Sequence, residues 1–195
     1  MDFPLTGMVG LLIRMADGSH GGMITVGSEG FAGVSVLLDT DTHMLSMVQQ
    51  LGGRVAAVPA AAFRQAVEAN PRLRRLTRRY VVYLLRLLQQ TLACERTHSL
   101  KERTSLWLLR VHAWMHDDSF VLTQDALAAM LSVRRQSVSE ASQELQQAGC
   151  IAISAQIRII DAERLARSAC PCFPTLNLAY DRLMRQSRSL SVSVR

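Results

Sequence analysis

The stretch from Arg72 to Thr97 constrains the fold most, because it contains neither glycine nor proline and its apolar positions recur at intervals of three and four residues. Such spacing is typical of a coiled-coil seam. The seam positions are Leu73, Leu76, Tyr80, Tyr83, Leu87, Gln90 and Cys94. A second apolar stripe lies on another face: Val81, Leu84, Leu85, Leu88 and Leu92. Two apolar faces on one helix are hard to cover in a small protein, so the pattern predicts a dimerisation helix over residues 71–98. A helix buried within one domain is the alternative.

The first 60 or so residues alternate short apolar runs with glycine. The runs cover residues 9–13, 21–26, 33–38, 44–48 and 54–58. Asp17-Gly18 lies between the first two and indicates a hairpin turn. We therefore expect a small antiparallel sheet, followed by a short helix over residues 60–69 that ends before Asn70-Pro71.

Composition limits the class of protein. Apolar residues make up 49% and charged residues 19%, which is typical of a folded globular chain, and no apolar run reaches the roughly 18 residues of a membrane span. The four cysteines are too scattered to build a disulfide framework, and a cytoplasmic location is expected. The net charge is +6, and every basic residue except Lys101 is arginine. The planar guanidinium group suits phosphate and guanine contacts, although charge alone is a weak indication of nucleic-acid binding.

Within residues 99–170, the stretch from Phe120 to Ile151 contains the most informative pattern. A helix is expected from Leu100 to Met115, and Thr123 is a good N-cap for another. Ser132-Val133 breaks that helix, and a further one follows, with inward apolar residues and a stop at Gly149. Two short helices joined by a tight turn make a helix-turn-helix. Residues 151–153 and 156–160 then predict a β-hairpin, the wing that contacts the DNA backbone.

The outward side chains of the second short helix can read base edges, since arginine pairs with guanine, glutamine with adenine and glutamate with cytosine. Arginines at a helix N-terminus oppose the helix dipole, which makes more sense if DNA lies opposite them. The candidate DNA-binding residues are Thr123, Arg134, Arg135, Gln136, Ser137, Ser139, Glu140 and Gln143. An ordinary solvated polar face is the alternative.

The chain resembles the Crp/Fnr regulators over nearly its whole length, in FPLTGMVGLLI (3–13), GSEGFAGV (27–34), FRQAVEANP (63–71) and, most specifically, LTQDALAAMLSVRRQSVSEASQELQQAGCI (122–151). The resemblance implies an α+β fold: a β-roll effector-like domain (1–70), a dimerisation helix (71–98), a winged helix-turn-helix (99–170) and a tail (171–195). The family's roll has further strands ahead of Phe3-Pro4, so an incomplete antiparallel β-roll is expected, from a shortened gene or a late start codon. The subgroup that the N-terminal pieces resemble does not in general use cyclic AMP.

Departures from the family pattern concern the effector first. In members that bind cyclic AMP, a Gly-Glu pair is followed by an Arg-Ser that grips the phosphate. Here Glu29 follows Ser28, and the stretch 39–43 has no arginine. Leu87 and Leu88 replace the dimer-helix hydroxyls that meet the adenine, and the N-terminal cysteine ligands of Fnr-type oxygen sensors are missing. The turn glycine of the DNA-binding motif is Ser132, and the wing turn has Ala155-Gln156 in place of a glycine.

Other constellations are weaker. His112 and His116 could share a metal, but HAWMH lacks the glutamate of a zinc hydrolase; Cys170-Pro-Cys172 could bind metal or sense redox state, but a lone pair is more often structural. The sequence therefore predicts no enzyme, no cofactor and no metal site.

The sequence predicts a homodimeric transcription regulator acting on a palindromic operator. The expected partners are double-stranded DNA, a second copy of the chain, RNA polymerase and a small-molecule effector, with no membrane. A ligand-binding or protein-interaction module with a decayed DNA-binding motif is the alternative. One more helix is expected from Phe173 to Met184.

Overall fold

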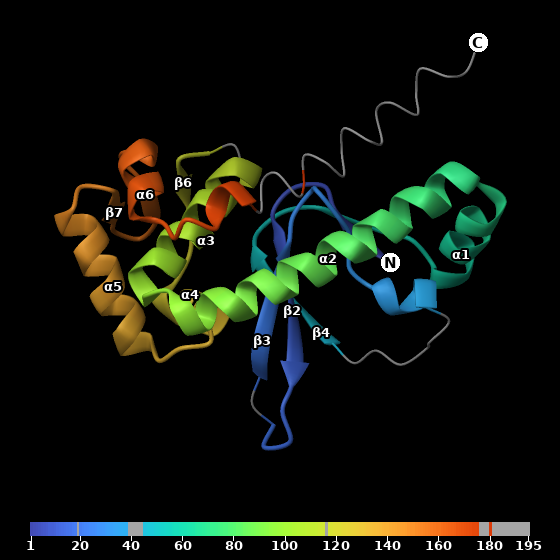
Figure 1. Ribbon diagram of the computed structural model, residues 1–195, viewed down its shortest axis with the longest axis horizontal. Helices are drawn as coiled ribbons and strands as arrows, with labels where there is room; N and C mark the ends of the chain where they lie inside the picture. Colours follow the sequence, from blue (N-terminus) through green and yellow to red (C-terminus); the bar gives the residue numbers. More distant parts are fainter. Residues whose placement is uncertain (19, 39–44, 116, 176–179, 181–195) are drawn as a thin grey trace, which may run out of the picture.

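The computed structural model describes residues 1–18, 20–38, 45–115, 117–175 and 180. A three-stranded antiparallel sheet in the order β3-β2-β4 forms the centre of the N-terminal half (Figure 1). Its strands are β2 (Met8–Arg14), β3 (His20–Val26) and β4 (Leu45–Leu51). The hairpin between β2 and β3 turns at Gly18, whose φ of 82° favours glycine. Two further strands, β1 (Asp2–Pro4) and β5 (Val55–Ala57), pair antiparallel beside this sheet. The predicted antiparallel sheet is confirmed, and its two small sheets make an incomplete roll.

One expected sheet segment is wrong. Residues 33–38 were expected to extend the sheet, but Val34–Leu38 form a 3₁₀ helix, η1. Gly33 has a φ of 97°, which turns the chain out of the extended conformation, and the N–H of Val36 donates to the carbonyl of Gly33 at 3.1 Å. The stretch 39–43, where the phosphate-gripping arginine is missing, lies outside the described residues.

Two helices join the roll to the C-terminal half at the predicted positions. Helix α1 (Ala60–Ala69) ends at Asn70, and α2 (Pro71–Thr97) starts directly after it. The side chain of Asn70 accepts hydrogen bonds from the backbone N–H groups of Arg72 and Leu73, at 3.0 and 3.1 Å. A capping asparagine followed by proline at the first helical position is a strong helix start.

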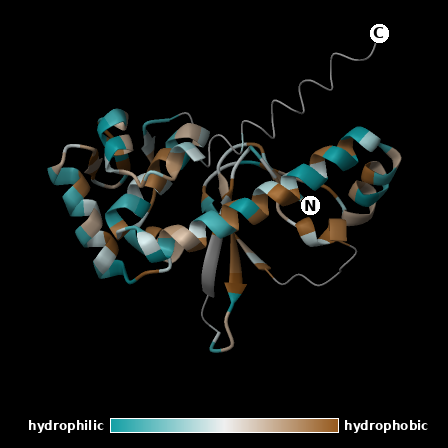
Figure 2. Cartoon of the chain, viewed as in Figure 1, coloured by the Kyte–Doolittle hydropathy of each residue, from teal (hydrophilic) through white to brown (hydrophobic). Residues whose placement is uncertain are grey.

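Helix α2 crosses the molecule from α1 to the C-terminal helices, and apolar residues occur along its length (Figures 1 and 2). The structure corrects the face expected to meet a partner. Tyr80, Tyr83, Leu87 and Cys94 are buried within the chain itself. Phe31 in the roll explains why this face of α2 turns inward. Its ring centroid lies 4.4 Å from that of Tyr80. Its backbone N–H donates to the Tyr80 hydroxyl, which in turn donates to the Phe31 carbonyl, both at 3.0 Å.

The second apolar stripe of α2 is the exposed one. Leu85, Leu88 and Leu92 are 55%, 45% and 57% exposed, and Val81 is half-buried beside them. The four residues are spaced at intervals of four, three and four, which is also a coiled-coil spacing. Leu84, in the same predicted stripe, packs inward.

The C-terminal half is a helical cluster with a small sheet. Helices α3 (Leu100–Met115), α4 (Gln124–Leu131), α5 (Arg135–Gln147) and α6 (Ala162–Ser168) surround a core of apolar side chains. Strands β6 (Ser119–Phe120), β8 (Ile157–Ile159) and β7 (Ile151–Ile153) form an antiparallel sheet in that order. Met8 and Leu51 of the roll join the same core, so the halves share an apolar contact.

None of the helices described is both long and apolar enough to cross a lipid bilayer. His116 and most of the helix expected from Phe173 to Met184 lie outside the described residues.

Candidate nucleic-acid interface

The C-terminal half, residues 99–170, is called the reading head here, and the first helix of its helix-turn-helix is fixed at its start by the predicted cap. Thr123 Oγ1 accepts a hydrogen bond from the backbone N–H of Ala126 at 3.1 Å. Because this oxygen satisfies one of the free N–H groups of the first turn, the start of α4 is well defined. Thr123 is itself exposed and lies at the surface.

The turn between α4 and α5 depends on Ser132. This residue adopts the left-handed conformation, with φ 53° and ψ 44°, and it is the single non-glycine residue with positive φ in the described part of the chain. The turn brings three apolar residues of α5, namely Val138, Ala141 and Leu145, into the core. Their burial fixes the rotation of α5 and directs its polar residues outward.

The outward face of α5 carries most of the predicted base-reading residues. Five of them are exposed: Arg134, Arg135, Gln136, Glu140 and Gln143. Ser137 and Ser139 are half-buried. Arg134 is the N-cap residue, and its side chain makes no capping hydrogen bond. The free N–H groups of that first turn therefore favour an anion opposite them.

Two neighbours that sequence reasoning did not assign to the site position its side chains. Asp125 Oδ1 lies 3.4 Å from Arg135 Nε, and both side chains are largely exposed. Gln124 Oε1 accepts a hydrogen bond from the Ser139 hydroxyl, which also reaches the carbonyl of Arg135 at 3.2 Å. Both neighbours lie in the first turn of α4. Their contact with α5 depends on the angle between the two helices, which the sequence pattern does not give.

The exposed α5 residues also interact along the helix. Gln136 Nε2 donates to Glu140 Oε1 at 3.3 Å, four residues later. Such a pair on a solvent-exposed face is weak, so both groups can exchange it for contacts with a base edge.

The wing forms without a glycine in its turn. Ser154 N donates to Gln156 O at 2.9 Å, which closes the hairpin between β7 and β8. Arg158 is exposed on β8 and adds a cation to the wing. Strand β6, which sequence reasoning did not identify, pairs with β8 and ties the wing to the end of α3.

Where the roll meets the reading head, a pocket opens between β3, α2, α3 and α4. Its lining includes Thr25, Leu87, Arg103, Trp107, Arg110 and Met130. Helix α4 packs directly against β3, and the indole N–H of Trp107 donates to Thr25 Oγ1 at 3.5 Å. This junction therefore connects the sheet physically to the helix-turn-helix.

Ionisable groups are buried on the roll side of this junction. Burial raises the pKa of Glu29, against a smaller opposing effect from its backbone hydrogen bonds and from Arg110. Burial also raises the pKa of Tyr83 to about 12 and that of Tyr80 further. Glu29 Oε2 and Arg110 Nη2 are buried without a hydrogen-bond partner among the described residues.

Of the candidate metal ligands, His112 forms a hydrogen bond with Asp118, at 2.7 Å from Nε2 to Oδ1. Cys170 and Cys172 lie beside Cys94, which was expected in the dimer seam. Burial raises the pKa of Cys170 to about 12 and raises that of Cys172 as well.

Known proteins share both the motif and the fold. Residues 102–168 match the Crp-like helix-turn-helix domain. No curated protein sequence matches the chain. FixK2 from Bradyrhizobium japonicum has 16% identity and a TM-score of 0.67, covering 87% of this chain and 86% of its own. A CRP/FNR-family transcriptional regulator from Thermus thermophilus has 19% identity and a TM-score of 0.65, covering 86% of each chain. The c-di-GMP-responsive regulator CLP from Xanthomonas campestris has 13% identity and a TM-score of 0.64, covering 82% of this chain and 84% of its own.

These matches agree with the two-part architecture described above. The helix-turn-helix match includes α4, its turn, α5 and the wing. The solved structures share the fold of both halves. Residues 102–168 are therefore a Crp-like helix-turn-helix domain, and the chain as a whole has the fold of solved Crp/Fnr-type regulators.

Proposed function

We propose that the chain acts as a cytoplasmic homodimer that reads a palindromic operator with α5. In this proposal, residues 1–70 respond to the effector, residues 71–98 form the dimer contact and residues 99–170 bind DNA. The observation that supports the reading role best is the exposed polar face of α5, held in place by three buried apolar residues. A buried polar face of α5 would have favoured the alternative function, a ligand-binding or protein-interaction module with a decayed DNA-binding motif.

The reading face divides into base contacts and backbone contacts. Arg135 lies in the first turn of α5, where a bidentate contact to guanine is worth roughly 1–3 kcal/mol of discrimination. Asp125 holds the guanidinium group at the edge of α4 in the free protein. Since this ion pair is exposed, it is worth at most about 1 kcal/mol, so DNA can displace it. Arg134, at the N-cap, and Arg158, on the wing, contact phosphates in this proposal.

The dimer seam in this proposal is the exposed stripe of Val81, Leu85, Leu88 and Leu92. A seam along α2 brings two reading heads to one side of the assembly. Two recognition helices related by a two-fold axis enter successive major grooves, so the half-sites should lie about one helical turn apart.

Control by a small molecule acts, in our proposal, through the junction between β3 and α4. A ligand in the pocket would contact residues of both halves and change the angle between them. The effector we infer is not cyclic AMP, since Ser28-Glu29 stands in place of the Gly-Glu pair of the members that bind it, and the stretch 39–43 has no arginine to hold the phosphate. RNA polymerase remains the expected partner after DNA binding.

Sequence selection with purified protein and random DNA tests the reading role. Wild type should select one palindromic motif, and Arg135→Ala should relax it at one symmetric pair of positions, by about 10-fold or more in preference. Gln147→Ala, at the far end of the same helix, is the matched control and should leave the motif unchanged. If wild type selects no motif, the regulator proposal fails; if Arg135→Ala selects the wild-type motif, only the arginine assignment fails.

Salt dependence of binding separates the two arginines. Arg134→Ala should weaken binding to all sequences alike. It should also make the slope of log affinity against log salt less steep, by the amount that about one phosphate contact per subunit contributes. Arg167→Ala removes the same charge from α6, where Arg167 pairs with Glu163, and should leave the slope unchanged. Equal slopes for wild type and Arg134→Ala would contradict the phosphate assignment.

A further inference from the structure

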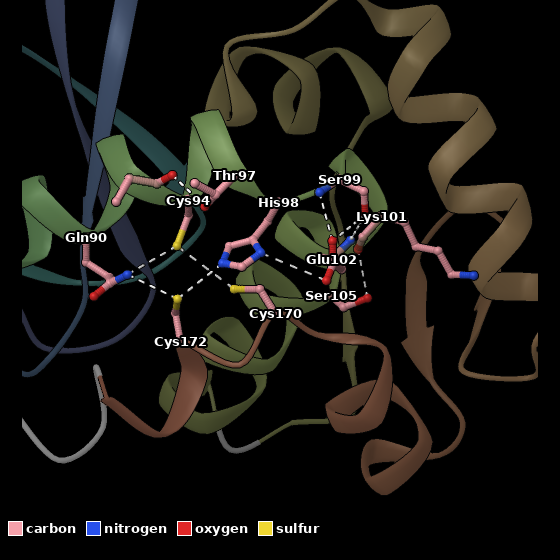
Figure 3. A network of polar contacts seen from close by, with 11 residues as sticks. Gln90, Cys94, Thr97, His98, Ser99, Lys101, Glu102, Ser105, Cys170 and Cys172 are labelled. Carbon is pink, nitrogen blue, oxygen red and sulfur yellow. Dashed lines mark hydrogen bonds and ion pairs between the residues drawn. The ribbon is translucent and has the colours of Figure 1, made fainter.

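Three cysteines and a histidine from separate segments meet where the end of α2 touches the chain after α6 (Figure 3). Cys94 lies in the last turns of α2, and His98 is the C-cap residue of the same helix. Cys170 and Cys172 follow α6. The three sulfur atoms and one imidazole nitrogen all lie within 4.8 Å of one another. Cys94 and Cys170 are buried, and the other two are half-buried, so the cluster is largely shielded from water.

The distances suit a tetrahedral zinc ion. With Zn–S bonds of about 2.3 Å and a Zn–N bond of about 2.0–2.1 Å, ligands of a tetrahedral site lie roughly 3.8 Å apart for two sulfurs and roughly 3.6 Å apart for sulfur and nitrogen. Cys94 Sγ and Cys170 Sγ are 4.0 Å apart. Cys172 Sγ and His98 Nε2 are 3.4 Å apart. These ligand atoms could close on an ion with small side-chain movements.

The groups around the cluster support the same chemistry. Glu102 Oε1 lies 4.0 Å from His98 Nδ1, on the opposite edge of the ring from the sulfurs. A carboxylate there favours a proton on Nδ1, which leaves the lone pair of Nε2 directed at the cluster. Ser99 fixes that carboxylate, because its backbone N–H and hydroxyl both donate to Glu102 Oε2, at 2.8 and 2.7 Å.

A donor also faces the sulfurs. Gln90 Nε2 lies 3.1 Å from Cys172 Sγ and 3.5 Å from Cys94 Sγ. An amide N–H directed at two sulfurs stabilises negative charge on them, as thiolate ligands require.

From this geometry we propose that Cys94, His98, Cys170 and Cys172 form a structural site for one zinc-class divalent cation. Three thiolates and one imidazole are an established ligand set for structural zinc, and four protein ligands leave no open position for catalysis. The ion would join the end of α2 to the segment behind the reading head. The proposal does not depend on DNA binding, because metal content is measured without DNA.

Metal analysis of the full chain, purified without an affinity tag under reducing conditions, is the direct test. Wild type should contain about one zinc ion per chain, and Co²⁺ in its place should give the absorption bands of tetrahedral, thiolate-bound cobalt. Cys172→Ser and His98→Gln should each lose most of the zinc. Cys150→Ser is the matched control, since Cys150 is a buried thiol near Ser168 and outside the cluster. The cobalt spectrum of wild type decides the question even if a variant fails to fold.

Glu102 acts on the ion through His98 and is a positioning residue. Glu102→Gln keeps all four ligands, and we expect zinc affinity, measured by competition with a chromophoric chelator, to fall by about 10–100-fold. Glu163→Gln, on exposed α6, is the control and should bind like wild type. Four results would overturn the proposal: folded wild type that holds no metal, Cys172→Ser that binds zinc like wild type, iron with acid-labile sulfide, or a Cys94–Cys170 disulfide in the protein as purified.

Discussion

Ser132 holds the turn of the reading head in a conformation that favours glycine. At its φ of 53°, the Cβ atom of an L-residue comes too close to the following backbone carbonyl oxygen. We expect Ser132→Gly to raise the free energy of unfolding by up to about 1 kcal/mol, because glycine adopts this conformation without strain. Urea denaturation should show a higher midpoint with an unchanged m-value.

The control for this substitution lies a few residues away. Ser137 lies within the first turns of α5, so Ser137→Gly should lower the free energy of unfolding by about 0.5–1 kcal/mol. If both variants lower the midpoint, strain at Ser132 is not the reason for the effect.

Glu29 makes stability depend on pH. Burial raises its pKa in the folded protein, so the folded state keeps its proton to a higher pH than the unfolded chain, whose value is 4.5. The folded state then binds more protons, and stability is lost as pH rises from about the unfolded value through the folded pKa. Glu29→Gln should therefore raise the free energy of unfolding at neutral pH and flatten its pH profile above 4.5.

Denaturation measured across this pH range checks the prediction. Glu163→Gln is the control, since the side chain of Glu163 is 91% exposed. A profile of Glu29→Gln that is parallel to wild type would show that Glu29 does not cause the dependence.

At the scale of elements, α2 uses two faces for two purposes. The face with Tyr80 and Leu87 is covered by the chain's own roll, which leaves Leu85, Leu88 and Leu92 exposed. Leu85→Asp combined with Leu88→Asp should weaken self-association by more than about 100-fold, because two buried leucines at a seam are replaced by repelling charges.

Sedimentation equilibrium at micromolar concentration distinguishes the outcomes. Wild type should be a dimer and the double variant a monomer. Leu38→Asp changes a leucine that is 62% exposed outside α2, and it should remain dimeric. A monomeric wild type would contradict the seam.

The same helix shows what sequence can and cannot give. Periodicity located α2 and both of its apolar stripes, but two stripes with coiled-coil spacing are equivalent until one is covered. The contact of Phe31 with Tyr80 decides between them, and it joins residues 49 positions apart. The helix-turn-helix was predictable in detail because its cap, turn and inward residues are local signals. The Asp125–Arg135 pair was missed, and Cys170-Pro-Cys172 was set aside as a lone pair, because contacts between separate elements bring Asp125 to Arg135 and bring Cys94 and His98 to the pair.

At the scale of the whole molecule, the roll and the reading head are not independent bodies joined by a linker. Met8 and Leu51 of the roll lie in the core of the C-terminal half, and α4 packs on β3. A shift of strand β3 would therefore move α4, the first helix of the helix-turn-helix, directly.

A metal ion bound by the cysteine cluster would also restrict the unfolded chain. Cys94 and Cys170 are 76 residues apart, and every helix of the reading head lies between them. A bound ion would close this segment into a ring, and a cross-link over a loop of that length removes unfolded-chain entropy equivalent to about 4–5 kcal/mol at 25 °C in the simplest model. The reading head could then not separate from the end of α2 without first releasing the ion, so loss of metal would change how cooperatively the two halves unfold.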